Sequence, residues 1–311
     1  MTVFRAFAPG TVANVGPGLD ILGLALAGRG DVVSAFPAGG DRLVIRASGH
    51  PDLSADPARN TAGIAADGVR KRAGASSTGL VLEVRKGLPL SGGQGGSAAS
   101  AVAAAFATNA LLGSPLSRAQ LLAPCLDAEE AVSGRHADNV AAALFGGVVL
   151  IRSIDPFELV ALPFPRELLV VLAEPDQRVS TEEARSRLPS VLSRETALSQ
   201  AANVGALVAA LASGDFDLLR RSVDDRIAEP ARAGLLPGFS EAKAAALEAG
   251  AFGCSISGSG PAAFAFAAGA EMADRIAAVM REAYASRGVR AATRVTAVDP
   301  MGARLLPTEE P

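Results

Sequence analysis

The segment of this chain best suited to chemistry is rich in glycine and reads Pro89-Leu90-Ser91-Gly92-Gly93-Gln94-Gly95-Gly96-Ser97-Ala98-Ala99. Glycine lets the backbone approach a ligand closely and turn successive N–H groups toward one concave site. A long alanine-rich helix is predicted directly after the segment, and the positive end of its dipole would favour an anion. The segment therefore predicts a phosphate-binding loop in which Ser97 contacts Mg²⁺ or a phosphate oxygen. The structural alternative is a flexible connection ahead of a helix.

Two familiar phosphate-binding loops fit this segment poorly. The chain contains no Gly-Lys pair, which excludes a Walker A loop. Gly93, Gly95 and Ala98 have the spacing of the dinucleotide-binding fingerprint, but that fingerprint requires a second strand with an acidic residue about 20 positions later. Residues 112–120 contain Gly, Ser, Pro and Arg and predict no strand. A nicotinamide-dependent dehydrogenase is therefore disfavoured.

Four other segments place polar side chains among small and apolar ones, at residues 7–20, 133–147, 175–185 and 253–261. Each has a plain structural interpretation. In chain order these are an ordinary turn, a helix capped by Asp138 or Asn139, a helix that begins with a capping box at Ser180, and a glycine turn between strands. Thr181 and Arg185 are four residues apart on the predicted helix, so they share one face and could both present to a ligand.

Composition limits the class of partner. The chain has 311 residues, of which 49% are hydrophobic but only 4% aromatic, and its net charge is −3. It lacks both the aromatic platforms and the basic surface that nucleic-acid binding requires. The most apolar stretch, residues 97–113, is too short and too polar to cross a membrane. Cys125 and Cys254 lie far apart and match no metal or disulfide pattern. We therefore expect a soluble cytoplasmic protein, with no signal peptide, nucleic-acid partner or membrane partner.

The elements that must position these segments mix strands and helices without regular alternation, which predicts an α+β fold. The predicted strands cover residues 3–8, 41–48, 79–85, 148–152, 167–173, 254–257, 262–267 and 291–298, and residues 19–27 form a further strand or a turn. The predicted helices cover residues 60–72, about 97–112, 117–132, 181–188, 199–212, 216–222, 239–249 and 270–287. Residues 9–18 predict a turn. The length predicts about two domains. The prolines at positions 156, 163 and 165 place their boundary near residue 165, giving domains 1–165 and 166–311.

Taken in order, the segments resemble the homoserine kinases of the GHMP small-molecule kinase superfamily. The resemblance is carried by residues 8–23, 89–99, 133–147, 175–189, 229–239 and 251–261, which span most of the chain. It implies a two-domain α+β fold with a ribosomal-protein-S5-like first half and a ferredoxin-like second half. It also implies ATP-dependent phosphorylation of L-homoserine to O-phospho-L-homoserine in threonine biosynthesis, commonly by a homodimer.

The same resemblance implies where the nucleotide and the metal ion bind. The loop at residues 89–99 would hold the triphosphate of ATP. Ser97 and Glu129 would hold Mg²⁺, with Glu130 as the neighbouring alternative. His136 is disfavoured as a metal ligand because the only other histidine, His50, lies in a separate loop.

Homoserine is a zwitterion, so its site should carry both signs of charge. Asp20 with Asn14 suits the ammonium group, and the guanidinium forks of Arg185 and Arg232 suit the carboxylate. Thr181, His136 and Asp138 would complete the pocket. Asn139 would orient the hydroxyl group or the γ-phosphate, and Asn139, Asp138 and Arg185 form the expected catalytic set. The general base stays open between Asp138 and direct proton transfer to a phosphate oxygen.

The chain departs from the family pattern at three positions. Gln94 replaces the usual Leu of the phosphate loop, Gly96 replaces its first Ser, and Ala142 replaces a Pro. The lost hydroxyl group at position 96 could weaken a metal or phosphate contact. Two alternatives therefore stay open beside homoserine kinase activity. One is a GHMP kinase for another small alcohol, and the other is a non-catalytic sensor of an amino acid or nucleotide.

Overall fold

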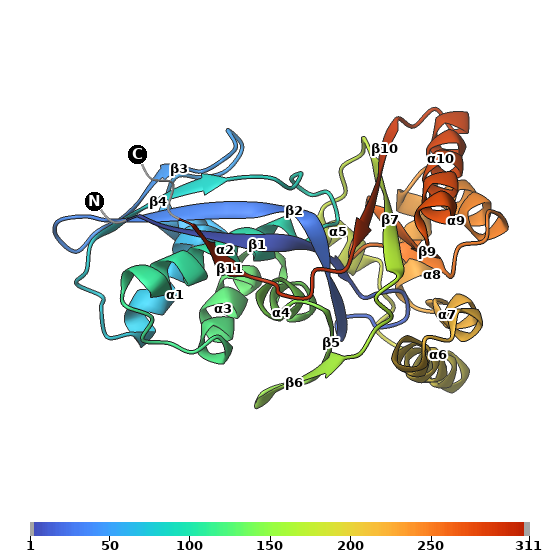
Figure 1. Cartoon of the computed structure of the whole chain (residues 1–311), viewed down its shortest axis with the longest axis horizontal. Coiled ribbons are helices and arrows are strands. Elements are labelled where there is room, and N and C mark those ends of the chain that lie inside the picture. Colours follow the sequence, from blue (N-terminus) through green and yellow to red (C-terminus); the bar gives the residue numbers. More distant parts are fainter. Residues whose placement is uncertain (1–2, 308–311) are drawn as a thin grey trace.

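The computed structural model describes residues 3–307, which fold around two antiparallel-rich β-sheets (Figure 1). The first sheet contains β1 (Phe4–Ala13), β2 (Leu22–Pro37), β3 (Leu43–Ala47), β4 (Leu80–Arg85), β5 (Val148–Ile154), β6 (Phe157–Leu162) and β11 (Arg304–Leu306). Its main strand order is β11-β1-β2-β4-β3, and β5 pairs with β2 and β6. The second sheet has the order β10-β7-β9-β8, from β7 (Leu168–Pro175), β8 (Cys254–Ile256), β9 (Ala263–Ala268) and β10 (Ala291–Ala297).

Four helices cover one face of the first sheet: α1 (Thr61–Arg72), α2 (Gly96–Leu111), α3 (Leu122–Ser133) and α4 (Asp138–Phe145). The central helix, α2, buries nearly every residue after its first turn, and most of these residues are alanines. Alanine combines the highest helix propensity with a small side chain, so α2 can pack closely against helices and strands on several sides. This packing fixes the N-terminus of α2, and with it the glycine-rich loop.

The second sheet carries its own helices: α5 (Thr181–Ser186), α6 (Arg194–Ser213), α7 (Phe216–Ser222), α8 (Ala228–Arg232), α9 (Phe239–Glu248) and α10 (Ala270–Ser286). α9 and α10 pack side by side on its outer face (Figure 1). A separate apolar cluster joins the two sheets through Leu22 and Leu24 of β2 and Phe264 and Phe266 of β9, with Leu207 of α6. The two halves therefore share a buried core, which holds the residues on either side of the site in register.

The α+β two-domain fold is confirmed, but the structure differs from the local predictions in several places. Residues 9–13 continue β1 instead of turning, because a register shift between Pro9 and Gly10 keeps the strand paired with β2. The sequence also gave no prediction for β6, α8, β11 or residues 28–37 of β2. Asp155-Pro156 forms the hairpin between β5 and β6, so it marks a turn within the first sheet. The division near residue 165 stays a prediction, since β11 returns from the end of the chain to pair with β1.

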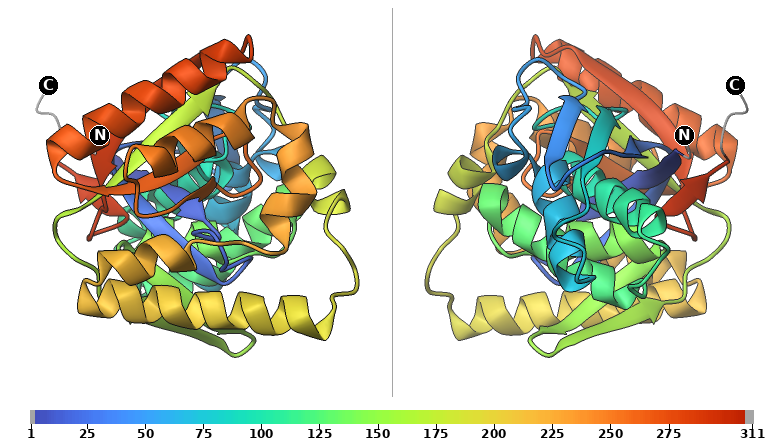
Figure 2. Two further views of the ribbon diagram at one scale, coloured as in Figure 1. Left: turned by 90° about the vertical axis from the view of Figure 1, so that its right-hand side faces the viewer. Right: turned by 90° about the vertical axis from the view of Figure 1, so that its left-hand side faces the viewer.

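α6 lies along the outside of the molecule beside α7 (Figure 2). Among the described residues it is the one helix that is long and apolar enough to cross a membrane by length and composition. One such helix is weak evidence for a membrane span, because core helices of soluble proteins have the same length and composition. α6 packs Leu207, Ala210 and Leu211 onto the core.

Tyr284 of α10 offers a test of the second core. Its side chain is fully buried, and its hydroxyl oxygen has no hydrogen-bond partner within residues 3–307, the described part of the chain. Burial raises the pKa of that hydroxyl group. A buried hydroxyl group without a partner costs about 1–3 kcal/mol. Tyr284→Phe is therefore expected to keep or increase the free energy of unfolding, by up to about 1 kcal/mol, in urea denaturation. A loss of stability would show that the hydroxyl group is paired.

Candidate active site

A cleft of about 450 Å³ is lined by residues from both halves of the chain. One group of lining residues is the glycine-rich loop with the start of α2. A second group is charged or polar and consists of Asn14, Asp20, Glu129, His136, Asp138, Asn139, Thr181, Arg185 and Arg232. A third group includes Ser48, Leu53, Asn60 and Val84. The size and mixed polarity are typical of a small-molecule site.

The glycine-rich loop has a backbone that glycine makes possible at two positions. Gly93 and Gly95 have φ values of +72° and +63°, and Gly95 is the N-cap of α2. A Cβ atom at Gly95 would overlap the Thr11 hydroxyl group and lie 2.7 Å from Asn139 Oδ1. The loop is also held from both halves, since Thr11 N donates to Gln94 O at 3.1 Å and Ser257 Oγ donates to Gly93 O at 2.6 Å. The N–H groups at the start of α2 are thereby aimed into the cleft in a fixed arrangement.

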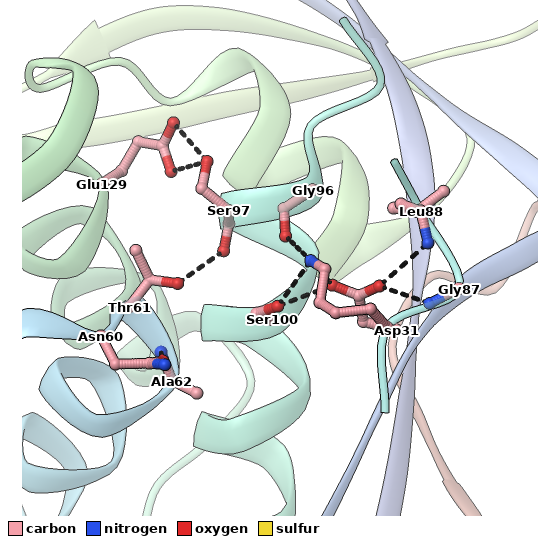
Figure 3. A network of polar contacts seen from close by, with 11 residues as sticks. Asp31, Asn60, Thr61, Ala62, Gly87, Leu88, Gly96, Ser97, Ser100 and Glu129 are labelled. Atoms are coloured by element: carbon pink, nitrogen blue, oxygen red, sulfur yellow. Dashed lines mark hydrogen bonds and ion pairs between the residues drawn. The ribbon is translucent and has the colours of Figure 1, made fainter. Parts of the chain in front are cut away.

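Behind the loop lies a buried ion pair that the sequence reading missed (Figure 3). The Lys86 ammonium pairs with the carboxylate of Asp31 and donates to Gly96 O at 2.8 Å and to Ser100 Oγ at 2.9 Å. The other oxygen of Asp31 accepts from the N–H groups of Gly87 and Leu88. Buried charges must be paired in this way because an isolated one is costly. The network ties β2, the end of β4 and the first turn of α2 together beneath the loop.

Ser97 and Glu129 form the oxygen-rich part of the cleft (Figure 3). Ser97 Oγ lies 3.1 Å and 2.9 Å from the two carboxylate oxygens of Glu129, and Thr61 Oγ1 donates to Ser97 O at 3.3 Å. Glu129 is only 4% exposed. Glu130 pairs with Arg135 and is not among the lining residues of the cleft. A hydroxyl group and one carboxylate fit Mg²⁺, which prefers oxygen ligands and keeps several waters or substrate phosphates.

Opposite charges meet in the polar part of the cleft. The Arg185 guanidinium binds both carboxylate oxygens of Asp20, at 2.7 Å and 3.3 Å, and His136 Nδ1 lies 3.7 Å from Asp20 Oδ1. Asn14 Oδ1 accepts from Asp20 N at 3.1 Å. Arg232 is buried and donates to the carbonyl groups of Ala184 and Gly258, and its burial lowers the pKa of its guanidinium. Asp20 is therefore held in one pocket with the two guanidinium groups of Arg185 and Arg232.

Asp138 and Asn139 begin α4, whose N-cap is Ala137, so the prediction that either one caps this helix was wrong. Thr11 Oγ1 donates to Asn139 Oδ1 at 2.6 Å. With its oxygen engaged by Thr11, the Asn139 amide has its Nδ2 donor available to the cleft. Asp138 is 3% exposed, and burial, followed by the negative charge of Asp20, raises its pKa to about 7. It can therefore exchange a proton near neutral pH.

Most residues singled out from the sequence for the site line the cleft, but Gln94, Ala98 and Ala99 do not, nor does the alternative metal ligand Glu130. The side chain of Gln94 is buried behind the loop, and Ala98 and Ala99 face the core. Besides Asp31 and Lys86, the sequence reading missed Thr11 as the partner of Asn139. It also missed the third group of lining residues. The signal available was weak, because a single threonine, lysine or aspartate within a strand carries no local pattern.

The chain matches two known protein families. Residues 60–147 match the GHMP kinases N terminal domain, and residues 207–286 match the family described as GHMP kinases C terminal. A homoserine kinase of Chlorobium phaeobacteroides is 42% identical over 91% of this chain and 92% of its own length. A homoserine kinase of Arabidopsis thaliana is 43% identical over 97% of this chain and 84% of its own length.

Solved structures agree with these matches. The homoserine kinase of Cytophaga hutchinsonii superposes with a TM-score of 0.94 at 39% identity, covering 98% of both chains. A galactose complex of Lactococcus lactis galactokinase superposes with a TM-score of 0.72 at 16% identity and shares the fold. The similarity to the homoserine kinases extends over nearly the whole chain. The chain therefore belongs to the homoserine kinase family of the GHMP kinases.

Proposed function

We propose that this protein transfers the γ-phosphoryl group of ATP to the hydroxyl group of L-homoserine, forming O-phospho-L-homoserine in threonine biosynthesis. The observation that carries the proposal is one cleft that joins an anion-binding loop to an Asp20–Arg185–Arg232 cluster. A zwitterionic amino acid with a hydroxyl side chain needs both parts. Such a reaction depends mainly on positioning and on stabilising charge.

The charged cluster supports a binding mode for the amino acid. Asp20 and Arg185 pair with each other, so their side chains already point to a common region. The substrate ammonium group would bind Asp20 with Asn14, and its carboxylate would bind Arg185 and Arg232. One ion pair is then exchanged for two, and the substrate is oriented in a single direction. Thr181 and His136 complete the wall of this pocket.

The loop supports binding of the nucleotide, since the kinases of this family use ATP. The backbone of residues 89–97 would hold the phosphates, with the buried Lys86 keeping the first turn of α2 in place. The third group of lining residues, Ser48, Leu53, Asn60 and Val84, is left for the base and ribose. Ser97 and Glu129 would hold Mg²⁺, which neutralises phosphate charge when bound.

Asn139 and Asp138 support the chemical step from the same helix. Asn139 Nδ2 would donate to the substrate hydroxyl or to the transferred phosphoryl group. Asp138 would accept the proton of the hydroxyl group as its oxygen attacks. A buried carboxyl with a pKa near 7 suits a general base at neutral pH.

A substrate panel tests the proposed function. ADP release with MgATP is measured for homoserine, serine, threonine and mevalonate, and the product is identified by phosphorus NMR. Homoserine is expected to give the highest kcat/KM and phosphohomoserine as product. Preference for another alcohol would favour a sibling GHMP kinase. Nucleotide binding without turnover of any alcohol would favour a sensor, and either result would overturn the proposal.

Thr11→Val tests the orientation of Asn139. The substitution keeps the shape of a fully buried side chain but removes the donor to Asn139 Oδ1. Without it the amide can rotate, so we expect kcat to fall about 10-fold, which corresponds to about 1.4 kcal/mol, while KM for homoserine changes little. Steady-state kinetics check this result. An unchanged kcat would show that Asn139 is oriented by other contacts.

We also propose a homodimer in a reducing cytoplasm. Val191, Leu192 and Leu198 expose large apolar side chains at and before the start of α6, where a second copy could cover them. Cys125 and Cys254 are both free and buried, as expected where disulfides do not form. Light scattering coupled to size-exclusion chromatography measures the mass of the assembly. A monomer at micromolar concentration would contradict the first of these proposals.

A further inference from the structure

The side chain of Gln94 makes a contact that the family pattern does not explain. Where the family loop usually has a leucine, Gln94 points away from the cleft and is 1% exposed. Its Oε1 accepts a hydrogen bond from Arg294 Nη2 at 3.2 Å, and its Nε2 has no hydrogen-bond partner among the residues that the structure describes. A buried amide donor without a partner is unfavourable. The stabilising interaction of the Gln94 side chain is therefore the hydrogen bond that its Oε1 accepts from Arg294.

Arg294 lies at the seam between the two sheets. It belongs to β10 of the second sheet, yet its Nη1 donates to Ala27 O of β2 at 3.3 Å. Its Nε lies 3.5 Å from a carboxylate oxygen of Glu174 in β7, whose other oxygen accepts from Arg29 Nη1 at 3.3 Å. Burial is the main cause that lowers the pKa of the Arg294 guanidinium. The Arg294 side chain is 15% exposed, and a guanidinium so largely removed from water depends on the acceptors that the protein supplies.

We propose that Gln94 and Arg294 are a matched pair of positioning residues that sets the phosphate loop against the second sheet. The adjacent Gly93 is held from the same side by Ser257 Oγ, so two consecutive loop residues are gripped by the second half of the chain. Movement of β10 relative to the first sheet would move the N–H groups on either side of Gln94. The inference rests on the proposed function, in which this loop binds the phosphates of ATP.

A double-mutant cycle with MgADP as the probe tests the pair. Gln94→Met keeps the volume of the side chain but removes the acceptor, so we expect the Kd for MgADP, from calorimetry, to rise about 5- to 20-fold. KM for homoserine should stay within about twofold. Arg294→Met should act similarly. The double variant should bind no more weakly than the weaker single variant, because residues of a coupled pair do not act additively.

Two further variants separate positioning from general stability. Gln94→Glu, unlike Gln94→Met, keeps an acceptor for Arg294. Its Kd for MgADP should therefore lie within about threefold of the wild-type value. Thr296→Val is the matched control. Thr296 Oγ1 donates to Ala27 O at 2.8 Å across the same seam, and its described hydrogen bonds go to Ala27 and Ala297 and not to the loop. It should lower the melting temperature without changing the Kd.

Three results would each contradict the proposal that Gln94 and Arg294 act as a pair. They are a Kd of Gln94→Met within twofold of the unchanged protein, multiplicative effects in the double variant, and equal losses in Gln94→Glu and Gln94→Met. Turnover of homoserine by the unchanged protein is measured separately. If the protein binds MgADP but phosphorylates another alcohol, the proposed substrate is wrong. The double-mutant cycle still tests the Gln94–Arg294 pair, because it measures the Kd for MgADP and not the turnover of homoserine.

Discussion

Asp138→Asn is expected to lower kcat by about 100- to 10,000-fold, the range that a positioned general base contributes. Asp138 is buried at the start of α4, beside Asn139 and within the same cleft as Asp20 and Arg185. Asparagine keeps the shape and one acceptor but cannot take the proton of the substrate hydroxyl. A variant that retained more than about a tenth of kcat would show that the proton moves directly to a phosphate oxygen.

The pH dependence follows from the same carboxyl. Because its pKa is raised to about 7, the basic form is populated only as the pH rises through 7. The kcat/KM of the wild-type protein is therefore expected to increase through pH 7 and to level about one pH unit above that pKa. Asp138→Asn should abolish this rise. Glu130→Gln is the control, because Glu130 pairs with Arg135 outside the cleft.

Asp138→Asn is expected to lower kcat but to keep or raise the free energy of unfolding at pH 8. A loss of activity together with unchanged or higher stability cannot result from misfolding. A raised pKa means that the folded protein holds this proton more tightly than the unfolded chain does. The free energy of unfolding then falls as the pH rises from about 4 to about 7. Asp138→Asn removes that loss, so at pH 8 it should unfold at the same or a higher urea concentration. The expected gain is at most roughly 4 kcal/mol.

Arg185→Met is expected to lower kcat/KM for homoserine by about 100- to 1000-fold, while KM for ATP changes less than about threefold. The Arg185 side chain is 28% exposed in the absence of substrate, and homoserine would cover the ion pair between this guanidinium and its own carboxylate. Removing one member of a charge pair that is buried in the complex costs about 2–5 kcal/mol. Arg187→Met on the same helix is the control, because Arg187 is exposed at the C-cap of α5. Initial-rate kinetics with each substrate varied in turn give both constants.

An analogue sharpens the assignment of Arg185. 3-Amino-1-propanol has the hydroxyl and ammonium groups of homoserine but no carboxylate. If Arg185 binds that carboxylate, Arg185→Met should cost much less activity with the analogue than with homoserine. Equal losses with both alcohols would show instead that Arg185 acts by holding Asp20, with which it pairs in the absence of substrate.

The local parts of the site were predictable because their signals are contiguous. Gly93 and Gly95 predict a loop whose backbone adopts positive φ, and both residues have positive φ in the structure. The predicted helix follows the loop directly as α2. Ser180 caps α5 through Glu183 N as its spacing predicts. The strand β1 was harder, since Pro9 and Gly10 are read locally as a turn. In the structure these two residues stay in the strand, because β1 pairs with β2 on both sides of a register shift between Pro9 and Gly10.

The chain sequence by itself determined the family, the α+β class, and the residue types that can bind a phosphate and a zwitterion. Tertiary structure alone decided which side chains control those residues. Thr11 and Asn139 are 128 positions apart, Lys86 and Asp31 are 55 apart, and Gln94 and Arg294 are 200 apart. Hydrogen bonds and ion pairs act only over a few ångströms, so their partners follow from the packing of the two sheets and not from spacing along the chain.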